Sequence, residues 1–258
     1  MRLATLGGSA AAPNPGEGCS GSLLETANAR IVLDLGPGTF PELRRHADYR
    51  TLSAVVISHL HLDHILDLLT LRNALAYNPI PPPDRIPLWL PPGGAQFLDD
   101  LARVFAEPDD VAGYFASFFS IEEYEPSKTL PIQDLILDFA PTVHYVPCWA
   151  IRVTEPATAK TLAYTADTGP AADLDRLIEG AQVLLAEATL PTSTEESRIE
   201  RGHLTARDAG LLAQRTGVEV LVLTHTFTEH GRETLTQPAA AVFDGQIVVA
   251  SAGRVIEW

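Results

Sequence analysis

The chain has 258 residues, 46% of them apolar and 20% charged, which is typical of a globular protein with a sizeable core. Its net charge of −15, from 18 basic and 33 acidic residues, disfavours long polyanions such as nucleic acids as partners. No run approaches the roughly 18 consecutive apolar residues of a membrane span, and the first residues lack the apolar stretch of a signal peptide.

Apolar runs bounded by turn residues alternate with helical patterns along the chain, and this alternation predicts an α/β protein. Strands are predicted within residues 2–6, 29–38, 53–58, 135–144, 148–154, 161–167, 181–190 and 218–225, with short strands within 244–258. Helices are predicted within residues 63–79, 170–180 and 204–217. The last of these has Thr205 as its N-cap and Gly217 as its stop. Short strands without crossovers at both ends indicate that part of each sheet is antiparallel.

Residues 79–130 differ in composition from the rest of the chain. Their first part is rich in proline, and "YFASFFSIEEY" follows with five aromatic residues. This pattern predicts an acidic insertion packed over a single domain that spans residues 1–258. We expect Tyr114, Phe115, Phe118 and Phe119 to cover the site mouth or to form the contact of a homodimer, because exposed aromatic clusters are unfavourable in a monomer. The alternative is a small separate core.

The two cysteines, Cys19 and Cys148, are too few for a disulfide framework, so we expect a reduced, cytoplasmic setting. Cys148 begins an apolar strand, where a buried thiol is expected, and the role of Cys19 is open. His230 follows His225 closely, and its role is open as well.

The segment "HLHLDH" places His59, His61, Asp63 and His64 directly after the apolar run that ends at Ser58. The first two histidines are two positions apart on a turn that leaves a strand, so both point to the same side. Asp63 and His64 open the next helix and can face a second point nearby. Imidazole and carboxylate groups are preferred metal ligands, so one short loop can supply two adjacent metals.

Three further ligand-type residues, His144, Asp167 and His225, each lie just past an apolar run. Ligands of open α/β sheets gather beyond the carboxyl ends of the strands. The sequence therefore predicts that these side chains lie close to the histidine loop, residues 59–64, at one edge of the protein.

The segments "HLHLDH", "VHYVP", "YTADTGP" and "LTHTF", in this order, resemble the metallo-β-lactamase-fold hydrolases over nearly the whole chain. The resemblance implies a four-layer αββα sandwich of two mixed β-sheets flanked by helices, with a dinuclear metal centre between the sheets. It implies one metal bound by His59, His61 and His144, a second bound by Asp63, His64 and His225, and Asp167 as the bridge. Zn²⁺ and Mn²⁺ both fit these ligands.

The same resemblance gives roles to two aspartates. Asp63 would orient the attacking hydroxide as well as bind metal. Asp34 resembles the aspartate that supports the histidine loop from behind, although a polar residue at a strand end explains it equally well.

Glu187 in "EAT" and His203 in "HLT" are similar to paired loops of the ribonuclease Z group. That similarity implies phosphodiester cleavage, in which His203 protonates the leaving oxygen and Glu187 hydrogen-bonds it. The alternative is that His203 merely precedes a helix cap.

Three functions remain open. The space between His144 and Asp167 is filled by two predicted strands and leaves no room for the tRNA-gripping arm of ribonuclease Z. Together with the negative charge, this favours hydrolysis of a small phosphodiester such as a cyclic nucleotide. The alternatives are a tRNA 3′-end processing endonuclease and a non-catalytic metal-dependent binding or sensor module.

Overall fold

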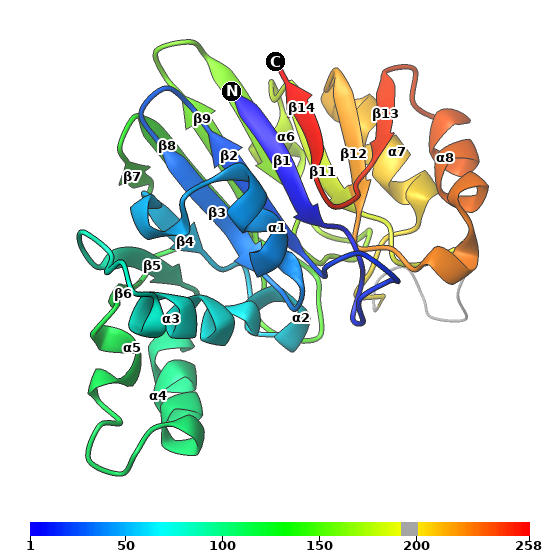
Figure 1. The fold of residues 1–258 in the computed structure, drawn as a ribbon. Helices are drawn as coiled ribbons and strands as arrows, with labels where there is room; N and C mark the ends of the chain where they lie inside the picture. Colours follow the sequence, from blue (N-terminus) through cyan, green and yellow to red (C-terminus); the bar gives the residue numbers. More distant parts are fainter. Residues whose placement is uncertain (192–200) are drawn as a thin grey trace.

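The computed structural model describes residues 1–191 and 201–258. Two seven-stranded sheets pack face to face, and helices lie on their outer sides (Figure 1). Three buried apolar clusters fill the space between the sheets and the space between each sheet and its helices. The predicted four-layer αββα sandwich is therefore confirmed.

The first sheet has the strand order β14-β1-β2-β3-β4-β5-β6. Its strands are β1 (Arg2–Gly7), β2 (Gly21–Glu25), β3 (Arg30–Leu35), β4 (Ala54–Val56), β5 (Ile86–Leu90), β6 (Phe119–Glu123) and β14 (Arg254–Glu257). The pairing is antiparallel from β14 to β3 and parallel from β3 to β6, so the sheet is mixed as predicted.

The second sheet has the order β13-β12-β11-β10-β9-β8-β7. Its strands are β7 (Leu130–Ile132), β8 (Leu135–Pro141), β9 (Trp149–Glu155), β10 (Lys160–Tyr164), β11 (Val183–Glu187), β12 (Val220–Thr224) and β13 (Gln246–Val249). The pairing is antiparallel from β7 to β10 and parallel from β10 to β13. The carboxyl ends of β10, β11 and β12 consequently lie side by side.

Eight α-helices occur in the described residues. They are α1 (Thr39–His46), α2 (Leu62–Ile65), α3 (Asp67–Tyr77), α4 (Gly94–Phe105), α5 (Gly113–Ala116), α6 (Asp175–Ile178), α7 (Ala206–Thr216) and α8 (Arg232–Ala240). Short 3₁₀ helices cover Tyr49–Thr51 and Thr228–His230.

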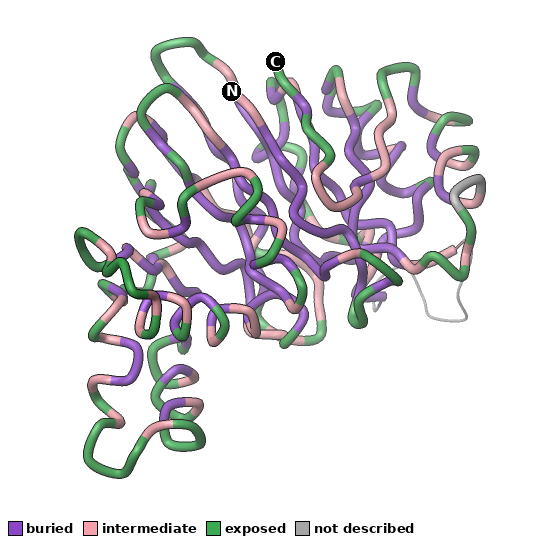
Figure 2. Tube along the Cα trace, viewed as in Figure 1, coloured by how far each residue is buried: buried purple, intermediate pink, exposed green. Residues whose placement is uncertain are grey.

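Strand alternation explains how one strand serves two cores. In β3, Ile31 and Leu33 belong to the core between the sheets, whereas Val32 packs toward the helices. Successive side chains of a strand point to opposite faces, so a strand buried on both faces reads as a continuous apolar run. Figure 2 shows this burial along the strands of both sheets.

Local signals set the ends of α7 as predicted. The Thr205 hydroxyl accepts a hydrogen bond from the Asp208 backbone N–H, and the Asp208 carboxylate accepts one from the Thr205 backbone N–H. Gly217 ends the helix at φ 71°, a left-handed conformation that glycine adopts readily. The helix predicted within 63–79 is instead two helices, α2 and α3, joined at Leu66.

Residues 79–130, predicted to be an insertion over the scaffold, contribute β5 and β6 to the first sheet. Tyr114, Phe115 and Phe119 are buried in the core beneath that sheet, and Phe118 packs partly buried against it. The expectation that the aromatic residues cover the site mouth or form a subunit contact is therefore wrong for the three buried ones. Two prolines within or beside β5 concealed the strand.

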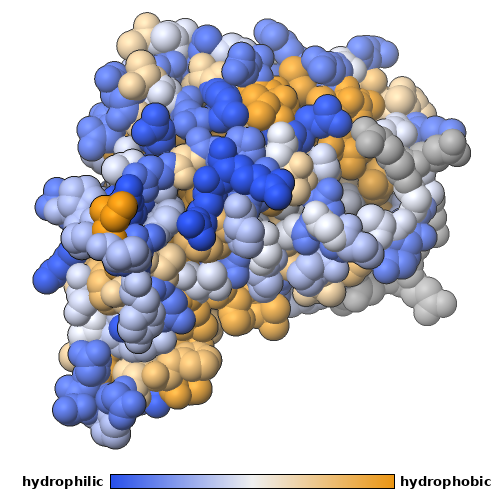
Figure 3. All heavy atoms as spheres, viewed as in Figure 1, coloured by the Kyte–Doolittle hydropathy of each residue, from blue (hydrophilic) through white to orange (hydrophobic). Residues whose placement is uncertain are grey.

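The helices α4 and α5 form a lobe in which more residues are exposed than along the strands of the sheets (Figure 2). Val104 and Phe105, at the end of α4, are largely exposed. Figure 3 shows hydrophobic residues gathered on this lobe. Within residues 1–191 and 201–258, no helix combines the length and apolar character needed to cross a membrane.

Candidate metal centre

The turn after β4 positions the histidine loop. His59 and His64 are fully buried, and Asp63 is nearly so, although all three are polar. Burying a polar group costs free energy unless a partner compensates, so these side chains need hydrogen-bond partners or a bound metal ion. Asp63 and His64 lie on the short helix α2, and the His64 ring centroid lies 4.0 Å from that of His59.

Three imidazole nitrogens converge at one point. His59 Nε2 lies 3.2 Å from His61 Nδ1, and His144 Nε2 lies 3.0 Å from that same atom. One Asp167 oxygen, Oδ2, lies 3.7 Å from the Nε2 atoms of both His59 and His144. These spacings suit nitrogen and oxygen ligands arranged around a single ion.

A second group meets beside the first. His225 Nε2 lies 3.0 Å from Asp63 Oδ2 and 3.4 Å from Asp167 Oδ2. His64 Nε2 lies 3.3 Å from the other Asp167 oxygen, Oδ1. Asp167 therefore faces both groups, and the ligand-type atoms of each group lie within 4.8 Å of one another. Each group could hold a metal ion.

The electrostatics of the two groups favour a bound cation. His64 Nε2 and Asp167 Oδ1 are buried and have no hydrogen-bond partner among the described residues. Burial lowers the pKa of His64, but the carboxylates of Asp167 and Asp34 outweigh burial and raise that pKa well above its ordinary value. Burial raises the pKa of Asp167, yet the charges of His225 and His64 hold it well below its ordinary range. The Asp167 carboxylate thus supplies negative charge where a metal ion would fit.

Asp34 supports the histidine loop from behind. Its Oδ2 accepts hydrogen bonds from His64 Nδ1, Tyr164 Oη and Ser58 Oγ, each at 2.7 Å, and its Oδ1 accepts one from Ser58 N at 2.7 Å. Ser58 Oγ in turn lies 3.0 Å from His59 Nδ1. One carboxylate therefore orients one histidine of each group, so that the Nε2 atoms face the centre.

The other histidines are oriented by different elements. His144 Nδ1 donates to the Gly202 carbonyl at 2.9 Å. His225 Nδ1 lies 2.7 Å from Thr189 Oγ1, and that hydroxyl donates to Glu187 Oε2 at 2.6 Å. Thr189 follows Glu187 by two positions in the "EAT" segment, but no sequence pattern assigned it a role.

His203 and Glu187 meet beside the second group. His203 Nδ1 lies 3.0 Å and 3.2 Å from the two Glu187 oxygens, and Glu187 is fully buried. Burial lowers the pKa of His203, but the hydrogen bond and charge of Glu187 outweigh burial and raise it above the ordinary value. The Glu187 carboxylate also accepts a hydrogen bond from Thr168 N at 2.7 Å. This network holds the imidazole in one orientation, with Nδ1 engaged.

The backbone is strained at the same place. Asp34, Ala166 and His225 have φ values of 58°, 49° and 54°. Residues other than glycine rarely adopt positive φ, and such conformations persist where the surrounding structure enforces them. Each of these three residues is, or directly precedes, a residue of the centre, whereas Gln133 and Ala159, which also have positive φ, lie in the β7–β8 and β9–β10 turns.

A cleft of about 260 Å³ opens onto this centre. It is lined by Ala11, His61, Leu62, Asp63, Asp167, His203 and His225. Members of both groups of ligand-type residues and the His203 imidazole therefore line one cavity.

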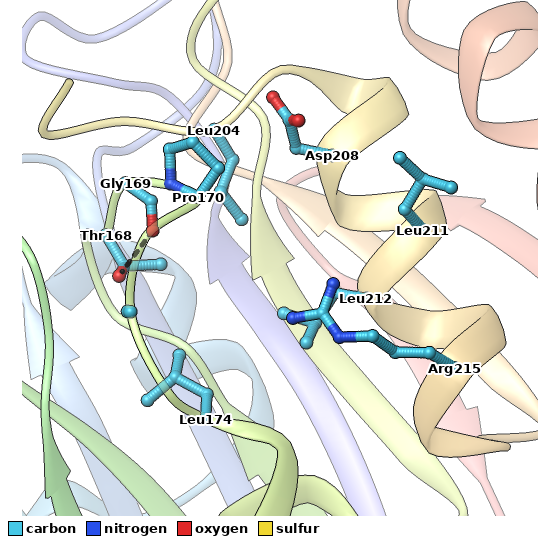
Figure 4. A pocket seen from close by; sticks show the side chains of 10 residues that line it. Thr168, Gly169, Pro170, Leu174, Leu204, Asp208, Leu211, Leu212 and Arg215 are labelled. Carbon is cyan, nitrogen blue, oxygen red and sulfur yellow. Dashed lines mark hydrogen bonds between the residues drawn. The ribbon is translucent and has the colours of Figure 1, made fainter. Parts of the chain in front are cut away.

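A smaller cavity of about 20 Å³ lies behind the centre, between the loop after β10 and helix α7 (Figure 4). Thr168, Gly169 and Pro170 line it on one side, and Leu212 and Arg215 on the other. A space of this size holds about one water molecule. It is a packing seam rather than a substrate site.

The structure brings all nine predicted site residues together. They are His59, His61, Asp63, His64, His144, Asp167, Glu187, His203 and His225. The two cysteines lie outside the three ligand groups found in the described residues. Burial, with the charges of Asp63 and Asp67, raises the pKa of the Cys19 thiol to about 12, and Cys148 Sγ donates to the Asp167 carbonyl.

The fold and the centre define a metallo-hydrolase of the β-lactamase fold. Residues 29–226 match the family model described as a Beta-lactamase superfamily domain, so the chain belongs to that superfamily.

Curated relatives cover nearly the whole chain. The uncharacterized protein Rv1339 of Mycobacterium tuberculosis is 31% identical over 251 residues, which are 96% of this chain and 88% of that protein. The probable metallo-hydrolase YhfI of Bacillus subtilis is 24% identical and is covered over its full length, as is this chain. The ribonuclease Z of Methanothermobacter thermautotrophicus is 24% identical over 94% of this chain and 92% of the enzyme.

Solved structures show the same fold. The crystal structure of YhfI from Bacillus subtilis has a TM-score of 0.83, 24% identity and 99% coverage of both chains. Human tRNase Z, short form, has a TM-score of 0.76, with 19% identity over 100% of this chain and 99% of that chain. A diphosphatase from the PhnP family has a TM-score of 0.75, with 17% identity over 100% and 97% of the two chains.

Proposed function

We propose that this chain is a dinuclear metallo-hydrolase that cleaves a phosphodiester bond in a small molecule, such as a cyclic nucleotide. The observation that carries the proposal is the His203–Glu187 pair, 3.0 Å apart, in which His203 lines the same cleft as members of two groups of metal-ligand side chains. A hydrolase that needs only activated water does not require such a pair, whereas an alkoxide leaving group needs a proton donor.

The donor set fits two divalent ions, because it is made of imidazole and carboxylate groups with orphaned buried atoms. His59, His61 and His144 would hold one ion, Asp63, His64 and His225 would hold the other, and Asp167 would bridge them. Zn²⁺ and Mn²⁺ both suit these ligands. When bound, such a pair supplies a water nucleophile near neutral pH and stabilises charge on the attacking and leaving oxygens.

The chain's own residues complete the chemistry. Asp63 accepts a hydrogen bond from the attacking water and fixes its direction. His203 gives a proton to the leaving oxygen from Nε2, because its Nδ1 is held by Glu187. Glu187 accepts hydrogen bonds from Thr168 N at 2.7 Å and Thr189 Oγ1 at 2.6 Å, which hold its carboxylate against the His203 imidazole.

The substrate class follows from what surrounds the centre. Between His144 and Asp167 the chain forms only β9, β10 and the short turn between them, so no extended arm leaves the fold there. The net charge of −15 opposes a polyanion. Relatives named ribonuclease Z support tRNA 3′-end processing as the second candidate, because that reaction would also cleave a phosphodiester bond.

The test is turnover of a phosphodiester panel by metal-loaded protein. The panel contains cyclic nucleotides, a glycerophosphodiester, bis-nitrophenyl phosphate and a precursor tRNA. We expect cyclic nucleotides or another small diester to be hydrolysed fastest, and an Asp167→Ala variant to hydrolyse none. Preferred cleavage of the precursor tRNA would favour the second candidate. Absence of turnover on the whole panel, with two ions bound, would refute a phosphodiesterase.

A further inference from the structure

Two large apolar side chains lie exposed at the mouth of the candidate metal centre. Leu62, between His61 and Asp63, is 56% exposed and lines the cleft. Tyr145, directly after His144, is 59% exposed. Large apolar side chains exposed beside a polar cleft commonly contact a ligand, because water is an unfavourable neighbour for them.

The Tyr145 ring is held in place before any ligand arrives. Its centroid lies 5.2 Å from that of His144 and 5.7 Å from that of His203. A Cβ added at Gly202 would lie 2.7 Å from Tyr145 Cζ, so the ring lies directly against the Gly202 backbone. The Gly202 N–H also donates to the Tyr145 hydroxyl at 3.4 Å. The ring is a rigid surface next to the His203 side chain.

We propose that Tyr145 is a stacking platform for the nucleobase of the substrate. The inference rests on the proposed function and narrows it to nucleotide-type phosphodiesters. A fixed, exposed aromatic ring gains most from a second flat ring, because stacking needs little further ordering of either partner. A glycerol or sugar phosphodiester offers no such ring and would gain nothing from Tyr145.

The competing explanation is that Tyr145 only supports the loop that carries His203. The two explanations differ in what they make dependent on the base. A platform changes the affinity for ligands that carry a base and leaves baseless ligands unaffected. If Tyr145 only supports the loop, its replacement changes the turnover of every substrate, because it displaces Gly202 and the neighbouring acid His203.

The experiment compares AMP with ribose 5-phosphate, which lacks the base, by calorimetric binding to the metal-loaded full chain. We expect wild-type protein to bind AMP more tightly than ribose 5-phosphate. Tyr145→Leu should weaken AMP binding by about 5- to 150-fold and leave ribose 5-phosphate binding unchanged. Tyr145→Phe, which keeps the ring, should bind AMP within about twofold of wild type. Equal affinity of wild type for both ligands, or an AMP preference that persists in Tyr145→Leu, overturns the inference.

A third ligand distinguishes a mononucleotide from RNA as the molecule whose base stacks on Tyr145. A short single-stranded RNA should bind no more tightly than AMP, because each added phosphate meets a protein of net charge −15. Markedly tighter binding of the RNA overturns the assignment to mononucleotides. The binding pattern does not depend on turnover. If the protein shows this binding pattern but hydrolyses no diester, only the proposed function is refuted. If it hydrolyses diesters but lacks this binding pattern, only the role of Tyr145 as a stacking platform is refuted.

Discussion

Replacement of Asp34 by asparagine should weaken binding at both candidate metal sites. The Asp34 carboxylate accepts four hydrogen bonds at 2.7 Å, from Ser58 N, Ser58 Oγ, His64 Nδ1 and Tyr164 Oη. An asparagine of the same size has one oxygen, so either the Ser58 N–H or the donors at the other oxygen must face an amide NH₂. A buried donor left without an acceptor costs about 1–3 kcal/mol.

The same change loosens the ligands. Asp34 holds His64 directly and reaches His59 through the Ser58 hydroxyl, so one ligand of each group loses its orientation. Removal of a supporting group behind a metal ligand typically costs about 10–100-fold in metal affinity. Alanine would strand all four donors, a cost of about 4–12 kcal/mol that approaches the whole stability of a domain. Asparagine is therefore the informative variant.

The assay is a competitive titration of Zn²⁺ against a fluorescent chelator, with urea unfolding of the metal-free protein in parallel. Asp34→Asn should bind both ions about 10–100-fold more weakly and unfold with about 1–3 kcal/mol less stability. Asp138→Asn, on β8 outside the three ligand groups, is the matched control and should change neither quantity measurably. Affinity of a folded Asp34→Asn protein within twofold of wild type for both ions would refute the reasoning.

Two further predictions concern the acid and the packing around it. His203→Ala should retain both ions and lose about 10²–10⁴-fold in kcat on an alkyl phosphodiester, with a smaller loss on a nitrophenyl ester that needs no proton. Asp167→Ala should lose both activities and bound metal, and equal losses on the two esters for His203→Ala would mean that His203 only positions substrate. Gly169→Ala should lower both stability and kcat, because its Cβ would lie 1.6 Å from the Arg201 carbonyl oxygen and push the loop that carries His203. Gly217→Ala is the control, because its Cβ would meet open space but its φ is 71°. Urea unfolding should show a loss of about 1–2 kcal/mol for this variant, while its kcat stays at the wild-type value. An unchanged kcat in Gly169→Ala would contradict the expected displacement of the His203 loop.

The sequence by itself determined those features that depend on residues close together along the chain, such as the ends of a helix and a buried strand. The cap at Thr205 and the stop at Gly217 act within a few residues, and both ends of α7 lie where they were predicted. The buried strand before His59 was also readable, because an apolar run bounded by turn residues is a local pattern. The order of the four motifs was sufficient to predict the fold class.

The tertiary structure alone decided how the centre is built. The Asp34 carboxylate meets Tyr164, 130 positions away, because β3 and β10 lie in facing sheets. The hydroxyl of Thr189 reaches His225 because β11 and β12 are parallel neighbours whose carboxyl ends coincide. Such contacts leave no periodic trace in the sequence, so neither Tyr164 nor Thr189 could be assigned from it.

The same reason explains the error over residues 79–130. Their prolines and aromatic residues predicted an insertion packed over the domain, because Pro87 is unusual within a sheet and clustered aromatic rings suggest a contact surface. The first sheet nevertheless extends through β5 and β6, and the core beneath it takes up Tyr114, Phe115 and Phe119. Composition describes what a segment can bury, whereas only the packed structure determines which surface it is buried against.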